Sequence, residues 1–171
     1  ETTLESLAAL RPAFKEDGKI TAGNSSGIND GAAAMVIMSA DKAKELGLKP
    51  LARIKAVGRG ACHPSVMGLS PVPAVKHLIA RSGLKLDDFE LIEVNEAFAA
   101  VIGAWLQETG ADWARVNVNG GAIALGHPLG CSGARLMTSL VHEMQRTGTR
   151  FGLQAICEGG GTANGTLLEL L

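Results

Sequence analysis

Asn95, His127 and Cys157 are the residues of this 171-residue chain whose types and settings best suit catalysis. An imidazole can act as a general base, a general acid or a donor to an oxyanion. A side-chain amide can hold a water or a substrate oxygen, and a thiol can give or take a proton. Together, the three groups would suit a reaction that moves a proton and stabilises negative charge.

His127 lies between Gly126 and Pro128 in the stretch NGGAIALGHPLGCSGAR. Proline favours the first turn of a helix, so the sequence predicts His127 at a helix start, beside unpaired N–H groups and the positive end of the helix dipole. A helix-capping or core histidine is the alternative. The flanking glycines, which let a ligand approach closely, favour a functional role.

Cys157 precedes Gly159, Gly160 and Gly161, whose successive N–H groups could form an anion-binding concavity. Such a concavity would hold a developing oxyanion and favour a thiolate nearby. Alternatively, Cys157 is a buried cysteine before a tight hairpin turn. Asn95 has a similar second interpretation, as the N-cap of the helix that follows it, and both of its roles can hold together.

The composition excludes several classes of protein. A net charge of −1 gives no electrostatic basis for nucleic-acid binding, and no apolar run is long enough to span a membrane. Three cysteines without paired spacing indicate a reducing compartment, and we expect a cytoplasmic location. Cys62-His63 lacks partners at metal-ligand spacing, so no metal site is predicted. The chain opens without Met or a leader pattern, and we expect a fragment.

Hydrophobic spacing predicts strands alternating with helices. Apolar residues recur at helical spacing before Gly83, Gly110 and Gly148, and Ser39 is a plausible N-cap. The predicted strands are 32–38, 51–61, 89–94, 116–119, 151–157 and 165–170, with helices over 40–46 and before each of those glycines.

This alternation predicts an α/β layered fold, with a mixed, mostly parallel sheet flanked by helices. The last two strands are close enough in sequence to form a hairpin. Because sites in open α/β sheets form at the carboxyl ends of strands, we expect Asn95, His127 and Cys157 to meet on one rim.

Five motifs together resemble the thiolase family, the acetyl-CoA acyltransferases. In the order of that family they are GNSSGINDGAAA at 23–34, VMG at 66–68, NEAF at 95–98, NGGAIALGHPLGCSGAR at 119–135 and CEGGG at 157–161. The resemblance implies acyl transfer between CoA thioesters, by thiolytic cleavage of a 3-ketoacyl-CoA or by the reverse condensation. It implies acyl-CoA and CoA as binding partners, no further cofactor, and a homodimer or homotetramer.

The resemblance also implies roles for individual residues. His127 would activate a nucleophilic cysteine and bind the thioester oxygen, Asn95 would hold a water beside it, and Cys157 would exchange a proton with the substrate. The Gly159 N–H would belong to a second oxyanion hole. Ser26 would contact the pantetheine arm, and Met67 and Phe98 would line the acyl pocket.

The family layout assigns residues 1–50 to the end of an N-terminal domain and its loop region, and residues 51–171 to a C-terminal domain. The nucleophilic cysteine of the family is absent, because Cys62 and Cys131 do not lie in its motif. The 171-residue chain alone is therefore predicted to be inactive. A non-catalytic module that binds acyl-CoA or lipid is the alternative; Cys157 argues against a decarboxylating synthase.

Overall fold

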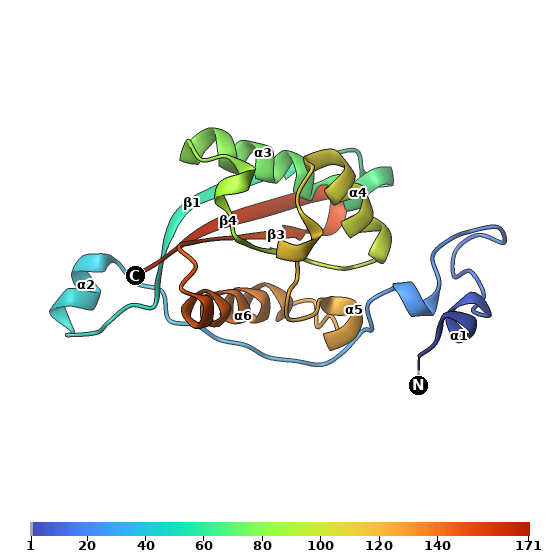
Figure 1. Ribbon diagram of the computed structural model, residues 1–171, viewed down its shortest axis with the longest axis horizontal. Helices are drawn as coiled ribbons and strands as arrows, with labels where there is room; N and C mark the ends of the chain where they lie inside the picture. Colours follow the sequence, from blue (N-terminus) through green and yellow to red (C-terminus); the bar gives the residue numbers. More distant parts are fainter. Residues whose placement is uncertain (1) are drawn as a thin grey trace.

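A four-stranded sheet lies between two layers of helices in the computed structural model, which describes residues 2–171 (Figure 1). Glu1, the first residue of the expected N-terminal segment, lies outside the described residues. In spatial order the strands are β1 (Ala52–Ala61), β4 (Thr162–Leu170), β3 (Phe151–Cys157) and β2 (Leu91–Val94). The helices α3 (Pro71–Ser82) and α4 (Ala99–Thr109) cover one face, and α6 (Ser132–Thr147) covers the other.

The expected mixed sheet flanked by helices is confirmed, but its pairings are mainly antiparallel. β1 pairs with β4, and β4 with β3, in antiparallel fashion, and only β2 and β3 run parallel. The short glycine turn after Cys157 forces β4 back along β3 as the predicted hairpin. The expectation of a mostly parallel sheet is therefore wrong, although the parallel pair β2–β3 is the one that matters for the site.

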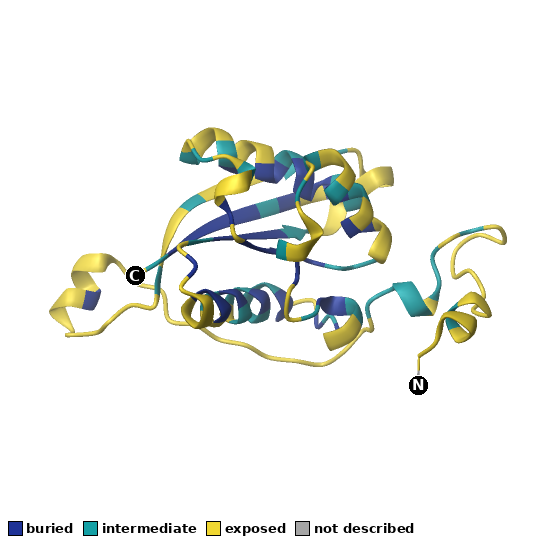
Figure 2. Cartoon of the chain, viewed as in Figure 1, coloured by how far each residue is buried: buried dark blue, intermediate teal, exposed yellow. Residues whose placement is uncertain are grey.

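The strands β2, β3 and β4 are mostly buried, whereas the edge strand β1 is largely exposed (Figure 2). On the side of α3 and α4, Leu78 and Trp105 pack against Leu153 in the larger apolar cluster. On the side of α6, Leu140 packs into a smaller cluster with Leu91, Met144 and Leu168. Because burying a large apolar side chain stabilises a fold by ~1.5–3 kcal/mol, these clusters hold the sheet edge that carries the site in a fixed position.

The helix ends follow the sequence closely. α3, α4 and α6 each end at a glycine with left-handed backbone, at Gly83, Gly110 and Gly148. The short helix α2 (Ala40–Glu45) begins after Ser39, whose hydroxyl accepts from the Lys42 N–H at 3.2 Å. These predictions are confirmed.

Two predicted strands are absent. Residues 32–38 form no strand, and Val36 is 85% exposed, because no other strand lies beside them within residues 2–171. Residues 116–119 provide only an isolated parallel bridge from Val116 to Ile92, since Asn117 then turns the chain with a φ of 49°.

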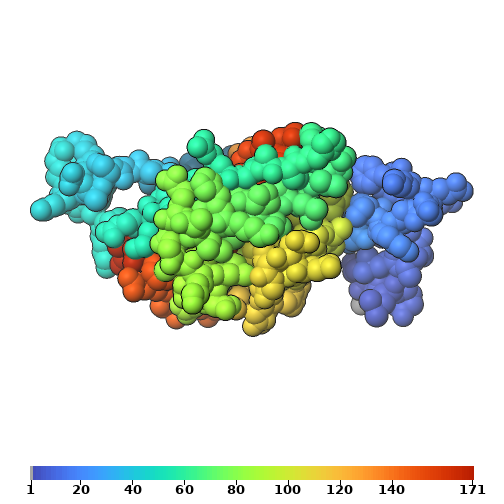
Figure 3. Space-filling view, turned by 90° about the horizontal axis from the view of Figure 1, so that it is seen from above, coloured from blue at the N-terminus to red at the C-terminus, as the bar shows by residue number. Residues whose placement is uncertain are grey.

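The segments before β1 lie outside the layered core. The first, with α1 (Leu4–Ala8) and a 3-10 turn at Ala22–Asn24, projects from one end of the molecule, and α2 projects from the other (Figure 3). The stretch between them, near residues 25–31, contacts the loops at the candidate site.

Candidate active site

The parallel strands β2 and β3 bring Asn95 and Cys157 to the same edge of the sheet. Cys157 is the last residue of β3, and Asn95 directly follows β2, where its N–H donates to the carbonyl of Ala155 at 3.0 Å. The Asn95 side chain is 1% exposed. Its alternative role as an N-cap is wrong, because α4 begins at Ala99 with Phe98 as its N-cap.

His127 reaches this edge from the loop between α5 (Ala122–Leu125) and α6. Its Nε2 lies 3.4 Å from Nδ2 of Asn95. The predicted position at a helix start is wrong: α6 begins at Ser132, because the Pro128 carbonyl first closes a turn with the N–H groups of Cys131 and Ser132. The three predicted groups still converge, as expected.

Hydrogen bonds determine which nitrogen of His127 carries the proton. Oγ of Ser132 lies 2.6 Å from Nδ1 and donates its only proton to the Pro128 carbonyl at 3.0 Å. With the Ser132 hydroxyl assigned to the Pro128 carbonyl, Nδ1 is the donor to Ser132, and the lone pair of Nε2 accepts from the Asn95 amide. This arrangement presents an unprotonated base to the site.

Burial and charge act on the two titratable groups of the site. Desolvation, with a smaller contribution from the Arg135 guanidinium, lowers the pKa of His127, so the imidazole is neutral near pH 7. Burial raises the pKa of the Cys157 thiol, and a hydrogen bond from Asn95 opposes this only in part. The expectation that the glycine turn favours a thiolate is therefore wrong for this structure. A thiol of raised pKa can instead give a proton to carbon and take one back.

Asn117 is a structural residue of the site that the sequence reasoning missed. Its Oδ1 accepts from the Val94 N–H at 2.8 Å and its Nδ2 donates to the Val94 carbonyl at 2.9 Å, as a neighbouring strand would. Nδ2 also donates to Glu96, whose other carboxylate oxygen accepts from the Ile123 N–H at the start of α5. An asparagine between β-branched residues was the available signal, since asparagine tolerates the left-handed backbone.

The predicted substrate-binding residues lie around the same edge. The N–H and Oγ of Ser26 both donate to the Ala97 carbonyl, at 3.1 and 3.2 Å. Phe98 stacks edge-on against Phe14 with ring centroids 5.9 Å apart. Met67 lies in the 3-10 segment Pro64–Leu69, which packs against the turn Gly159–Gly161 and leaves Met67 47% exposed.

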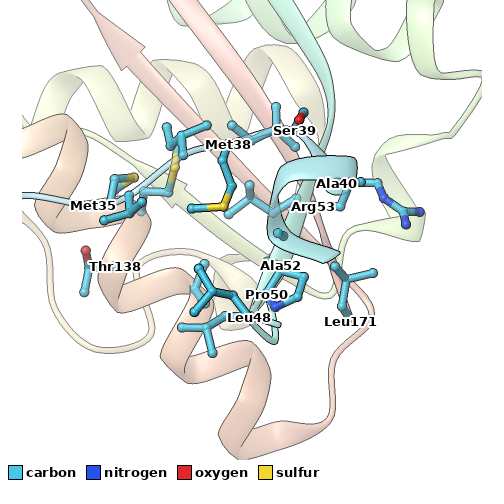
Figure 4. Close-up of a pocket in the computed structure, with 18 of the residues that line it drawn as sticks. Met35, Met38, Ser39, Ala40, Leu48, Pro50, Ala52, Arg53, Thr138 and Leu171 are labelled. Carbon is cyan, nitrogen blue, oxygen red and sulfur yellow. The ribbon is translucent and has the colours of Figure 1, made fainter. Parts of the chain in front are cut away.

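Away from this edge, α2, β1 and the middle of α6 enclose a groove of about 930 Å³ (Figure 4). Its lining is mostly apolar, with Met35, Met38, Leu48 and Leu171 among the contributing residues. None of the seven predicted site residues lines it. The groove is therefore separate from the candidate site.

Two family models match the chain. "Thiolase, C-terminal domain" matches residues 48–170, and "Thiolase, N-terminal domain" matches residues 1–41. The chain belongs to the thiolase family. The resemblance seen in the motifs is thereby confirmed.

Curated relatives of this thiolase chain are more than twice as long. It is 50% identical to the acetyl-CoA acetyltransferase of Syntrophomonas wolfei, covering 100% of this chain and 44% of the relative. It is 51% identical to the 3-ketoacyl-CoA thiolase of Aliivibrio fischeri, covering 99% of this chain and 45% of the relative. The chain thus spans less than half of a thiolase.

Solved thiolases have the same backbone. The acetyl-CoA acetyltransferase of Bacillus anthracis superposes with a TM-score of 0.96 at 47% identity, over 99% of this chain and 43% of that chain. Human mitochondrial 3-ketoacyl-CoA thiolase in complex with CoA superposes with a TM-score of 0.94 at 44% identity, over 100% and 43% of the two chains. Among residues 2–171 of this chain, no helix has the length and apolar character to cross a membrane.

Proposed function

We propose that the complete thiolase containing this chain transfers acyl groups between CoA thioesters. The observation that carries the proposal is the convergence of Nε2 of His127, the amide of Asn95 and the thiol of Cys157 at one edge of the sheet. A base, an amide donor and a proton-exchanging thiol are what carbon–carbon cleavage beside a thioester requires. The CoA complex of the human mitochondrial relative supports CoA as a substrate.

In cleavage, a cysteine thiolate from the part of the protein outside this chain attacks the 3-keto carbon of a 3-ketoacyl-CoA. Nε2 of His127 takes the proton of that thiol, and the Gly159 N–H is a donor to the resulting oxyanion on C3. The C2–C3 bond then breaks, and Cys157 protonates the enolate carbon to release acetyl-CoA. The Cys157 thiolate next takes the proton of an incoming CoA thiol, whose sulfur receives the acyl group.

The remaining residues would serve binding. His127 and the water held by Asn95 would also stabilise the thioester oxygen when it becomes the enolate oxygen, Ser26 would contact the pantetheine arm, and Met67 and Phe98 would line the acyl pocket. The position of Ser26 against the NEAF segment, and of Met67 against the Gly159 turn, supports these assignments. We place the domain boundary between residues 50 and 51, which the family matches to residues 1–41 and 48–170 support.

Three broader expectations remain part of the proposal. A role in fatty acid metabolism is supported by relatives named 3-ketoacyl-CoA thiolase. A cytoplasmic location is supported by cysteines that are all unpaired. Homo-oligomer formation, as a dimer or a tetramer, follows from the family resemblance.

A chimera tests the proposal. The chain is joined to the upstream part of the Syntrophomonas wolfei enzyme, and thiolysis of acetoacetyl-CoA is measured beside the 171-residue chain alone and a chimera carrying His127→Ala. We expect turnover only by the unmodified chimera. A folded chimera that binds CoA without turnover would overturn the proposal in favour of the non-catalytic acyl-CoA-binding module.

A further inference from the structure

The peptide bond between Gly126 and His127 is held from two other parts of the chain. The His127 N–H donates to the Gly27 carbonyl at 3.0 Å and to Oδ1 of Asn29 at 3.3 Å. On the opposite side, Nη2 of Arg135 donates to the Gly126 carbonyl at 3.2 Å. The imidazole is therefore attached to a peptide whose donor and acceptor are both fixed by tertiary contacts.

Asn29 fits against a position that only glycine can occupy. Gly126 has a φ of 89° and a ψ of 163°, a backbone conformation that other residues rarely adopt. A Cβ at Gly126 would overlap Oδ1 of Asn29. The Asn29 side chain thus fills the space that the missing side chain leaves, directly beside the peptide of His127.

Arg135 contributes charge as well as a hydrogen bond. It lies in the first turn of α6, and its Nε is buried without a hydrogen-bond partner among the described residues. Its guanidinium disfavours protonation of His127 and in turn acts on the buried Glu93 carboxyl of β2. The Cys157 thiol, from β3, is connected to the ring through Asn95. Among the described residues, Arg135 is the charged group that acts on the pKa of His127.

We propose that Asn29 and Arg135 are positioning residues, which fix the Gly126–His127 peptide and thereby keep the unprotonated Nε2 directed at Asn95. Their effect on turnover rests on the proposed function. Their effect on the ring itself does not, and it can be measured in the 171-residue chain without any activity.

In that chain, NMR of the ¹⁵N-labelled imidazole measures which ring nitrogen of His127 carries the proton and the pKa of the ring. In the unmodified chain we expect His127 to carry its proton on Nδ1 and to titrate below the ordinary value of ~6.5. Asn29→Ala should produce a mixture of tautomers, and Arg135→Met should raise the pKa of His127. Asp30→Ala, next to Asn29, and Arg146→Met, on the same helix but paired with Glu143, serve as matched controls that should change neither property.

The proposal is overturned if Asn29→Ala and Arg135→Met leave the tautomer and the pKa of His127 as in the unmodified chain. Asn29 is exposed, so its substitution should not prevent folding. If Arg135→Met does not fold, Asn29→Ala and the charge-retaining Arg135→Lys decide the question. With Arg135→Lys, the pKa should stay low while the tautomer preference weakens.

Kinetics in the chimera measure the consequence for catalysis. Asn29→Ala should lower kcat about fivefold to tenfold with little change in KM, as expected for one neutral hydrogen bond. Arg135→Met should lower kcat about 10- to 100-fold and move the acidic limb of the pH–rate profile to higher pH. If the chimera is inactive but the variants still change the tautomer or the pKa of His127, the positioning role is retained and the proposed function is rejected.

Discussion

Nδ2 of Asn95 lies 3.4 Å from Nε2 of His127, although the two residues are 32 positions apart in the chain. Asn95 is fixed by the end of a buried strand, and His127 by Ser132 on its other ring nitrogen. The amide therefore points at a lone pair whose direction does not depend on substrate. This preorganisation is what an oxyanion site requires, because donors that are already aligned need not reorganise during the reaction.

Asn95→Asp should remove the amide donor while keeping the shape of the side chain. We expect kcat in the complete enzyme to fall about 10²-fold, as for other lost oxyanion donors. The new carboxylate would stabilise the imidazolium and raise the pKa of His127, so the acidic limb of the pH–rate profile should move to higher pH. An unchanged kcat, with thermal unfolding also unchanged, would remove Asn95 from the mechanism.

Ser132→Ala should disturb His127 without contacting substrate. The substitution leaves the Nδ1 proton without its acceptor, so the imidazole loses its preferred tautomer and about 1 kcal/mol of hydrogen bonding. We expect kcat to fall about fivefold. Ser139→Ala, on the same helix and without a side-chain hydrogen bond among the described residues, is the control and should behave as the unmodified enzyme. Equal kcat for the two variants would show that Ser132 does not orient the base.

Glu93→Gln should change how stability depends on pH. Burial, as the largest effect, raises the pKa of Glu93 to about 7 from 4.5, and one carboxylate oxygen has no hydrogen-bond partner among the described residues. The folded state favours the protonated form of Glu93. The contribution of Glu93 to the free energy of unfolding is therefore fully present below pH 4.5 and is lost as the pH rises through about 7.

The cost of ionising Glu93 in the folded chain is on the order of 3 kcal/mol above pH 7. In urea unfolding, Glu93→Gln should therefore be at least as stable as the unmodified chain at pH 8, and less dependent on pH between 5 and 8. A variant that is less stable than the unmodified chain at pH 8 would show that the ionised Glu93 carboxylate is stabilising.

Gly161→Ala should open the turn that follows Cys157. Gly161 has a φ of 88°, and a Cβ there would press against the Cys62 carbonyl in the loop after β1. The left-handed backbone alone costs an alanine about 1–2 kcal/mol, so the free energy of unfolding should fall by at least that amount. Gly159→Ala, whose Cβ would meet no atom within 4 Å, is the matched control and should change stability by less than about 0.5 kcal/mol. Equal effects would show that the turn relaxes freely.

Much of the site was predictable because it depends on local chemistry. Helical spacing and C-terminal glycines gave the three long helices, and the two parallel strands placed Asn95 and Cys157 on one rim. Cys157 could be placed from the sequence because it ends an unambiguous apolar run, and Asn95 because it directly follows one.

Other features depend on contacts that the sequence does not display. His127 precedes its helix because the Pro128 carbonyl closes an extra turn, which a proline alone does not reveal. Residues 32–38 have the composition of a strand but no neighbouring strand within residues 2–171. The Asn117 side chain makes the hydrogen bonds to the Val94 backbone that a neighbouring strand would otherwise make. Ser132 and Arg135 contact His127 and its peptide only when α6 is folded against the loop.

Single-turnover and steady-state thiolysis of acetoacetyl-CoA by the complete enzyme carrying His127→Ala tests the central claim most directly. We predict that turnover falls by at least about 10²-fold, the usual contribution of a general acid–base group, while the fold and CoA binding persist. Near-normal turnover by a folded His127→Ala enzyme would contradict the account.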